Sequence, residues 1–286
     1  SINYPEFEVI VVNDGSTDNT LKLLIDHYKL KRIDLVYRNI LKTEAVRGFY
    51  YSPEVPNLIV IDKDKGGKSD ALNCGINMSH YPYFCSIDAD CVLERDSLIR
   101  LITPVVESTV PVIACSGVVR ILTKGMDYMY FKELVLPKKS LLIFQIVEYL
   151  RAFLFGRVGL DLANGLLILS GAFSLFQKSC VISVGGYSKK TVAEDMEIIL
   201  RLHRYYREKK VPYKIRFIAD PICWTEAPED LKSLARQRIR WQIGLLQSLC
   251  QHKNMILNPK YGFIGITVMP YFLFFEALGP FVEFLG

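Results

Sequence analysis

Two features that would assign this chain of 286 residues to common classes of protein are absent from it. Its basic residues form no run but are interspersed with acidic ones, and the net charge is only +5, so nucleic acid is not the favoured partner. Its seven cysteines lack the paired spacing of a zinc site or a disulfide framework. They lie in apolar stretches, as Cys85 and Cys115 do, and we interpret them as reduced core residues.

The chain also lacks a Gly-x-Gly-x-x-Gly motif after its first apolar segment, which argues against a dinucleotide-binding dehydrogenase. It has no internal repeat, low-complexity tract or flexible linker, so one compact domain with appendages is the simplest interpretation. Neither an initiating methionine nor a signal peptide precedes the first apolar strand, which begins within a few residues of Ser1. We therefore expect the chain to be a piece of a longer protein.

Hydrophobic residues, by contrast, are abundant: they make up 50% of the chain and give a mean hydropathy of +0.20. Much of the excess lies in residues 141–176 and 261–286. The second stretch approaches the ~20 residues of a bilayer span, although prolines and glutamates interrupt it. It is either a buried amphipathic helix or an interfacial segment that leads into a transmembrane helix, and we expect the second.

Apolar strands alternate with helices along the chain. Strands are expected at residues 9–12, 58–61, Tyr83–Ile87, 112–122 and 213–218, and helices at Thr20–Tyr28, 69–78, 98–107, 141–155, Glu194–Lys209 and 230–249. This order predicts an α/β fold with a mostly parallel sheet, whose ligands bind at the carboxyl ends of the strands. Asp14, Asp88 and Asp90 all lie at such ends.

Asp88 and Asp90 directly follow an apolar strand. Alternate side chains of an extended segment share a direction, so both carboxylates can converge on one divalent cation, and carboxylates favour Mg²⁺ or Mn²⁺. The alternative is a turn in which the aspartates only cap the backbone.

Asp14 and Lys68 stand in two loops that each precede a helix. Asp14 can accept hydrogen bonds from the N–H groups of a base, while the residues after it cap the next helix. Lys68 follows a Gly-Gly turn and enters a helix N-terminus, where anions bind. A solvated charged turn is an equal alternative for the second loop.

Two further motifs have structural explanations when each is considered alone. Glu194 and Asp195 open a helix, where acidic residues offset the helix dipole. In residues 237–241, which we call the QxxRW segment, Gln237 and Trp241 share one helix face. An indole can stack on a sugar and an arginine such as Arg240 can neutralise a diphosphate, but a buried tryptophan beside a basic surface is the alternative.

Taken together, in this order and spacing, residues 86–90, 193–195 and 237–241 resemble the family 2 inverting glycosyltransferases. Within that family they are similar to the processive synthases of cellulose, hyaluronan, chitin and poly-N-acetylglucosamine. The resemblance covers nearly the whole chain and includes residues 169–173, 185–187 and 223–228. It implies a GT-A type nucleotide-binding fold with additional membrane-interface helices.

The resemblance also implies a role for each donor-site residue. Asp14 would contact the uracil of a UDP-sugar and Lys68 would help to hold the nucleotide. Asp88 would bind the nucleotide, Asp90 would bind the Mg²⁺ or Mn²⁺ that bridges the diphosphate, and Arg240 would lie near the phosphates.

On the acceptor side, the resemblance makes Asp195 the general base and Glu194 its support. Gln237 and Trp241 would bind the acceptor, with Trp241 as a platform under its terminal sugar. Two departures from the family's pattern stand out: Ala193 replaces the usual threonine, and the family's first strand is absent and is expected upstream of Ser1.

The expected protein is thus an inverting synthase that extends a β-linked polysaccharide at the cytoplasmic face of the inner membrane. Residues 1–250 would form its catalytic domain and residues 251–286 an interfacial region at the start of a transmembrane segment. Its partners would be the UDP-sugar, the polysaccharide acceptor, membrane lipid and a secretion or export protein, and not nucleic acid. The alternatives are a non-processive family 2 transferase that adds one sugar to a lipid-linked or short glycan, and a non-catalytic nucleotide-sugar binder.

Overall fold

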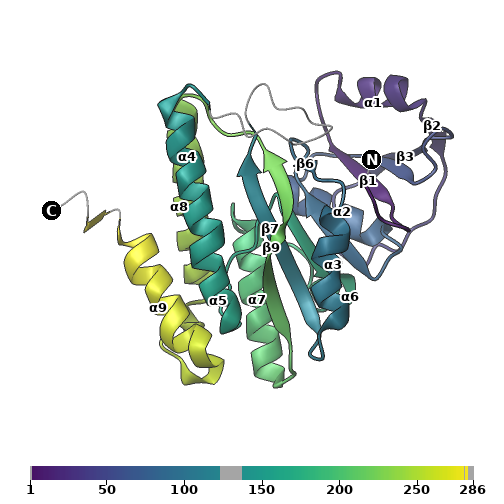
Figure 1. Ribbon diagram of the computed structural model, residues 1–286. Coiled ribbons are helices and arrows are strands. Elements are labelled where there is room, and N and C mark those ends of the chain that lie inside the picture. Colours follow the sequence, from purple (N-terminus) through teal and green to yellow (C-terminus); the bar gives the residue numbers. More distant parts are fainter. Residues whose placement is uncertain (1, 123–136, 280, 283–286) are drawn as a thin grey trace. The chain divides into compact units, whose positions relative to one another are not determined.

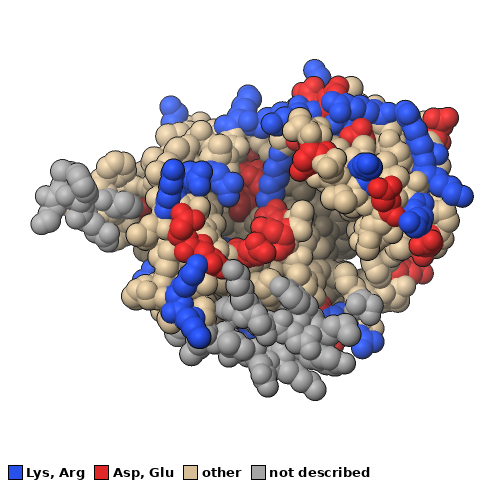
Figure 2. Space-filling view, turned by 90° about the horizontal axis from the view of Figure 1, so that it is seen from above, with Lys and Arg blue, Asp and Glu red and all other residues tan. Residues whose placement is uncertain are grey.

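The computed structural model describes residues 2–122, 137–279, 281 and 282 (Figure 1). The chain folds into two compact units. Residues 4–84 and 177–190 form the first, which we call the small unit, and the rest of the chain forms the large unit. On the face seen from above, Lys and Arg side chains lie among Asp and Glu side chains (Figure 2).

The small unit is built on a four-stranded sheet in the order β1-β4-β3-β2. Strand β1 (Val9–Asp14) runs parallel to β4 (Leu58–Lys63), whereas β3 (Val46–Tyr51) is antiparallel to both β4 and β2 (Lys31–Ile33).

Helices cover both faces of this sheet. On one face Ile61 of β4 packs with Cys74 and Met78 of α2 (Lys68–Met78); on the other Val60 packs with residues of α1 (Thr20–Tyr28). Strand β4 is consequently buried along almost its whole length. The short helix α6 (Lys178–Ser183) completes the small unit.

The second sheet has the order β5-β8-β7-β9-β6. Its central strand β7 (Val112–Ile121) is parallel to β9 (Lys214–Thr225) and antiparallel to β8 (Phe173–Gln177). At the edges lie β5 (Tyr83–Ile87) and the two-residue β6 (Val92–Leu93), which pairs antiparallel with β9.

Helices of the large unit surround this sheet. They are α3 (Ser97–Glu107), α4 (Ser140–Leu150), the π-helical turn η1 (Arg151–Arg157), α5 (Val158–Leu162), α7 (Glu194–Lys209) and α8 (Leu231–Gln251). Helix α7 has three acidic residues in its first turn and two basic residues in its last, which matches the helix dipole. It ends at Lys210, whose φ of 56° is left-handed.

The chain after α8 forms short helical turns. These are η2 (Lys253–Met255), η3 (Pro259–Tyr261), η4 (Ile264–Val268), α9 (Met269–Tyr271) and η5 (Phe272–Ala277). Their buried side chains, among them Met255 and Ile264, join Met196 and Leu200 of α7 in one core cluster. Among the described residues no helix has both the length and the apolar character to cross a membrane. Residues 280 and 283–286 of the expected interfacial region lie outside the described residues.

The fold class expected from the sequence is α/β, and this is confirmed, but the two sheets are mixed rather than mostly parallel. The reason lies in the strands β2, β3, β6 and β8, which were not predicted and which all pair antiparallel with a neighbour. The helix expected at residues 141–155 is divided into α4 and η1.

Candidate active site

Asp88 and Asp90 lie in the turn that follows β5. Cys91 donates its backbone N–H to the carbonyl oxygen of Asp88 over 3.1 Å, so the turn is closed by its own backbone. Asp88 is half-buried, whereas Asp90 is exposed and accepts a contact from the Cys91 thiol at 3.4 Å. Turn formation and ligand binding are therefore compatible here, since the Asp90 carboxylate remains accessible.

These two carboxylates fit a divalent cation only in combination with a ligand. Within the described ranges, no group of three or more His, Cys, Asp or Glu side chains is arranged to hold a metal ion. Mg²⁺ is usually bound through one or two carboxylates together with substrate phosphates. The exposed Asp90 suits such a shared site, in which a diphosphate supplies the remaining oxygens.

Asp195 is held at the N-terminus of α7. Its Oδ2 accepts a hydrogen bond from the Gly171 N–H at 3.1 Å, and its Oδ1 accepts one from the Met196 N–H at 2.9 Å. Glu194 and Asp195 are both half-buried. Gly171 belongs to residues 169–173, which the sequence marks as similar to a connecting segment of the family, and its N–H fixes the orientation of the proposed base.

Arg157 is a residue of this site that the sequence analysis missed. Burial lowers its pKa to about 10, and the nearby Asp195 carboxylate acts in the opposite direction by favouring the charged guanidinium. The guanidinium lies 4.0 Å from the Phe153 ring centroid, and its Nη1 is enclosed with no hydrogen-bond partner in the described part of the chain. The only signal in the sequence was an arginine in an apolar stretch, which Arg151 six residues earlier shares.

The helix that carries the QxxRW segment packs against the acid pair. Gly244 of α8 lies so close to Ala193 that a Cβ on Gly244 would be 2.4 Å from the Ala193 Cβ. One turn further, the Gln247 Oε1 accepts a hydrogen bond from the Val192 N–H at 3.0 Å. The fold therefore brings α8 and the segment before Glu194 together within the large unit.

The three predicted residues of the QxxRW segment differ in their surroundings. Gln237 is half-buried, and its Oε1 is enclosed with no hydrogen-bond partner among the residues that the structure describes. Arg240 is exposed. Trp241 is also exposed, and the guanidinium of Arg238 lies over its indole at 4.3 Å from the centroid. The alternative of a buried tryptophan is therefore wrong for Trp241.

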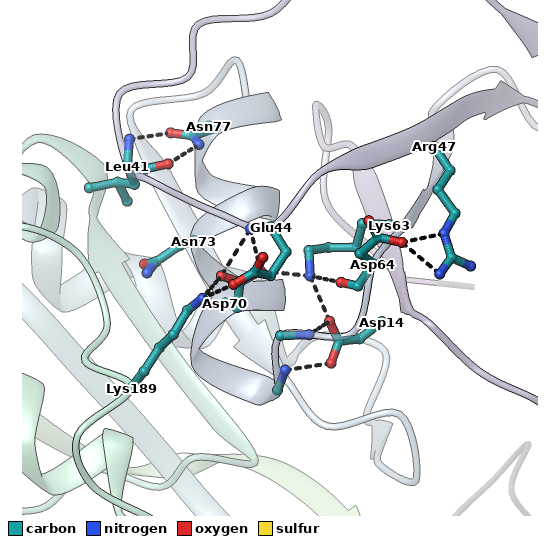
Figure 3. Close-up of polar contacts among 12 residues, drawn as sticks. Asp14, Leu41, Glu44, Arg47, Lys63, Asp64, Asp70, Asn73, Asn77 and Lys189 are labelled. Atoms are coloured by element: carbon teal, nitrogen blue, oxygen red, sulfur yellow. Dashed lines mark hydrogen bonds and ion pairs between the residues drawn. The ribbon is translucent and has the colours of Figure 1, made fainter.

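In the small unit, Asp14 accepts three hydrogen bonds (Figure 3). Its Oδ1 accepts from the Lys63 Nζ at 2.7 Å and from the Gly66 N–H at 2.9 Å, and its Oδ2 accepts from the Gly67 N–H at 2.7 Å. Burial would raise the pKa of Asp14, but these donors hold it below its ordinary value. Asp14 thus fixes the Gly-Gly turn before α2, in addition to any contact with a base.

Lys63 joins Asp14 to a second buried carboxylate. Its side chain is completely buried, and its Nζ lies 2.6 Å from the Asp70 Oδ1. Asp70 is equally buried and pairs on its other side with Lys189, which also contacts Glu44 at 3.0 Å (Figure 3). Lys63 is the last residue of β4, two residues beyond the strand expected at 58–61, and it lies opposite Asp14 in the strand register.

Glycines allow the two loops to approach each other. Gly15 has a φ of 65°, and a Cβ there would be 2.8 Å from the Lys65 backbone N. Gly67, with a φ of 86°, is the N-cap of α2, and Lys68 begins that helix with an exposed side chain. Lys68 therefore stands at a helix N-terminus as predicted, in the geometry that favours anions.

Residues 185–187 are tied to α2 by a reciprocal pair of hydrogen bonds. The Asn73 Nδ2 donates to the Tyr187 carbonyl at 2.9 Å, and the Tyr187 N–H donates to the Asn73 Oδ1 at 2.8 Å. A Cβ on Gly186 would lie 2.5 Å from the same Asn73 oxygen. A side chain at residue 186 would therefore clash with Asn73, so packing within the small unit requires the glycine.

The predicted site residues are distributed over both units. The large unit contains Asp88, Asp90, the acid pair and the QxxRW segment, while the small unit contains Asp14 and Lys68. Asp14, Asp88 and Asp90 lie where a strand ends, Lys68 and the acid pair lie where a helix begins, and the QxxRW segment lies within α8.

Comparison with known proteins gives consistent relatives. The chain is 29% identical over 247 residues to the poly-β-1,6-N-acetyl-D-glucosamine synthase of Staphylococcus epidermidis, and 31% identical over 248 residues to that of Staphylococcus aureus. In each case the match covers 85% of this chain and 48% of the relative, so the chain spans about half the length of these relatives.

Among solved structures, a mannosyltransferase of Pyrobaculum calidifontis, in complex with GDP-Man and Mn²⁺, superposes with a TM-score of 0.60 at 18% identity. The match covers 95% of this chain and 62% of that one, and it indicates a shared fold. The model of the family described as "Glycosyl transferase family 2" matches residues 1–181. The chain therefore belongs to glycosyl transferase family 2.

Proposed function

We propose that this chain is the catalytic part of an inverting synthase that transfers a sugar from a UDP-sugar to the non-reducing end of a growing β-linked polysaccharide. The relatives named above favour N-acetylglucosamine as the sugar. The observation that carries the proposal is the position of Asp195: it is oriented by the Gly171 N–H and lies at the start of a helix packed beside α8.

Asp195 would act as the general base in this reaction. Its carboxylate accepts the proton of the acceptor hydroxyl as that oxygen attacks the anomeric carbon, on the side opposite the departing diphosphate, which inverts the configuration. Arg157 favours the ionised form of the carboxylate through its charge. Glu194, beside it at the helix start, supports the base.

The donor would be held by residues at the strand ends. Asp14 and the turn that it fixes, together with Lys68, would receive the uridine and phosphate groups, and Asp88 and Arg240 would contact the nucleotide. Asp90 would hold a Mg²⁺ or Mn²⁺, which stabilises the negative charge of the leaving diphosphate when it is bound. Gln237 and Trp241 would bind the acceptor.

We further propose that the large unit contacts the cytoplasmic face of the inner membrane. Phe144 and Val147 of α4, and Phe274 and Phe275 of η5, are large apolar side chains that remain exposed. Amphipathic surfaces of this kind bury their apolar side chains at a lipid interface. Release of the full-length protein from membranes by salt without detergent would contradict this proposal.

The reaction is tested with the full-length protein in membranes, UDP-N-acetylglucosamine and Mg²⁺ or Mn²⁺. We expect release of UDP and, from a short acceptor, products of many added sugars. Asp195→Asn should abolish transfer while donor binding is retained, whereas Asp34→Asn, at an exposed position, should leave both unchanged. Full activity of Asp195→Asn would refute the base assignment, and products longer by one sugar only would favour a non-processive transferase.

A further inference from the structure

Trp241 is the exposed member of the chain's two tryptophans. Its exposed fraction is 41%, against 2% for Trp224, which is buried and donates its indole N–H to Glu94 at 3.1 Å. A large aromatic side chain at the surface has several rotamers available, and a sugar ring can stack on it only when the ring plane is fixed. The surroundings of Trp241 therefore decide whether it can serve as a platform.

Arg238 covers the Trp241 indole. The two residues are three apart on α8, the spacing that places side chains next to each other on a helix, and the guanidinium carbon lies 4.3 Å from the ring centroid. A guanidinium in this position is attracted to the face of the ring. Because Trp241 is still 41% exposed, the indole retains accessible surface for a second ring.

Glu148 fixes the arginine in turn. The Arg238 Nη2 lies 2.6 Å from the Glu148 Oε2, a contact between α8 and α4 (Figure 1). Helix α4 is itself anchored to the segment before α8, since the Gln145 Nε2 donates to the Pro228 carbonyl at 2.9 Å and the Lys139 Nζ lies 2.5 Å from the Glu229 Oε2. The position of α4 relative to α8 is therefore fixed, and with it the position of the Glu148 carboxylate beside Arg238.

We propose that Glu148 and Arg238 are positioning residues for the acceptor: Glu148 holds Arg238 against the indole, and Arg238 holds the plane of Trp241 for the terminal sugar. This inference rests on the proposed function, in which Trp241 binds the acceptor. Arg238 contacts both Glu148 and Trp241, and none of the three is among the residues proposed to hold the donor. The expected signature is a change in the KM for the acceptor alone.

The test uses full-length protein and an oligosaccharide of β-1,6-linked N-acetylglucosamine as the acceptor. Arg238→Met should raise the acceptor KM about two- to fivefold, the range for an exposed cation–π contact, and leave the donor KM and kcat unchanged. Glu148→Gln should act in the same direction, and Arg238→Lys should restore part of the affinity. Arg100→Met removes an exposed ion pair with Asp220 that involves neither α4 nor α8, and it should change neither KM.

A charge reversal separates positioning of the indole from a simple tie between two helices. In the double variant Glu148→Arg with Arg238→Glu, an ion pair can form again but no cation stands on residue 238. We expect the acceptor KM to stay raised, and its full recovery would overturn the inference.

Trp241→Ala distinguishes the two proposals. If it raises the acceptor KM while Arg238→Met does not, the positioning inference is wrong and the acceptor role of Trp241 stands. If Trp241→Ala leaves the acceptor KM unchanged, the positioning inference and the acceptor role of Trp241 are both wrong.

Discussion

Removal of the Lys63 ammonium tests the buried ion pairs of the small unit without altering a predicted ligand residue. Lys63→Met preserves most of the side-chain volume, but it leaves the completely buried Asp70 with Lys189 as its one remaining cation partner in the described part of the chain. It also removes the 2.7 Å contact that orients Asp14. Loss of one partner of a buried ion pair costs about 3–5 kcal/mol, a large part of the stability of a domain of this size.

The predicted consequence is a drop of at least about 10 °C in the melting temperature of the small unit, because 1 kcal/mol corresponds to roughly 4–8 °C in domains of 60–100 residues. The affinity for UDP should fall as well, because Lys63 no longer orients the Asp14 carboxylate that holds the Gly66–Gly67 turn. The measurements are thermal unfolding and UDP binding of the purified full-length protein. Lys65→Met, at an exposed lysine two residues away, is the control.

A second substitution tests the electrostatic explanation. In Lys63→Met with Asp70→Asn the uncompensated buried charge is gone, so the double variant should be more stable than Lys63→Met alone by about 1 kcal/mol or more. A melting temperature and UDP affinity of Lys63→Met equal to those of the Lys65→Met control would refute the reasoning.

The pH dependence of the stabilisation by the Lys63 ion pairs follows from the pKa shifts of Asp14, Asp70 and Lys63. Burial opposes ionisation of Asp14 and Asp70, but the lysines and backbone N–H groups outweigh it and lower both pKa values. The stabilisation is therefore present above about pH 3.9 and is lost as the pH falls through the lower pKa values of the folded state. Burial also opposes the charge of Lys63, but its two carboxylates raise its pKa, so the stabilisation is present below about pH 10.4 and is lost as pH rises further. The stability difference between Lys63→Met and wild type should therefore be nearly constant from about pH 5 to 9.

Two further predictions concern the large unit. Arg157→Met removes the buried cation near Asp195, so the acidic limb of the rate–pH profile should move to higher pH. Initial rates measured from pH 5 to 9 would detect the shift, and an unmoved limb would contradict the proposed effect of Arg157 on the base. Asp90→Asn should raise the Mn²⁺ concentration for half-maximal UDP release by roughly tenfold, because a neutral amide is a weaker ligand for a hard cation, and a metal titration that matches wild type would exclude Asp90 as a ligand.

Local patterns predicted the long helices and the apolar strands, although the strand expected at 213–218 covers only the first part of β9 (Lys214–Thr225). Thr20–Tyr28 and Glu194–Lys209 match α1 and α7 to the residue, because their apolar periodicity and terminal residues are local signals. Strand β3 (Val46–Tyr51) was missed because Arg47 and Gly48 interrupt its apolar alternation, and its position is set by pairing with β2 and β4. Pairing of this kind between distant segments cannot be read from periodicity.

The same distinction applies to the candidate site. The acidic residues at strand ends are predicted from a local signal, because ligands of α/β folds bind at the carboxyl ends of strands. Lys63 and Asp70 could not, since a lysine and an aspartate next to a Gly-Gly turn have the composition of a solvated loop. Their burial depends on the register that sets Asp14 opposite Lys63 and on Lys189, which is more than one hundred residues away in the sequence. Arg157 was missed for a related reason, because its surroundings are assembled from η1, β9 and the start of α7.

The replacement of the family's usual threonine by Ala193 has a physical context in the packing of α8. Gly244 has no Cβ, and the space that a Cβ would occupy is taken by the Ala193 Cβ. Two of the smallest residues thus meet where α8 packs against the segment before the acid pair. The adjacent hydrogen bond from the Val192 N–H to Gln247 fixes the position of this segment along α8. The position of Asp195 relative to α8 is therefore determined by residues outside the recognised motifs, and the hydroxyl lost at residue 193 is not needed to hold the two segments together.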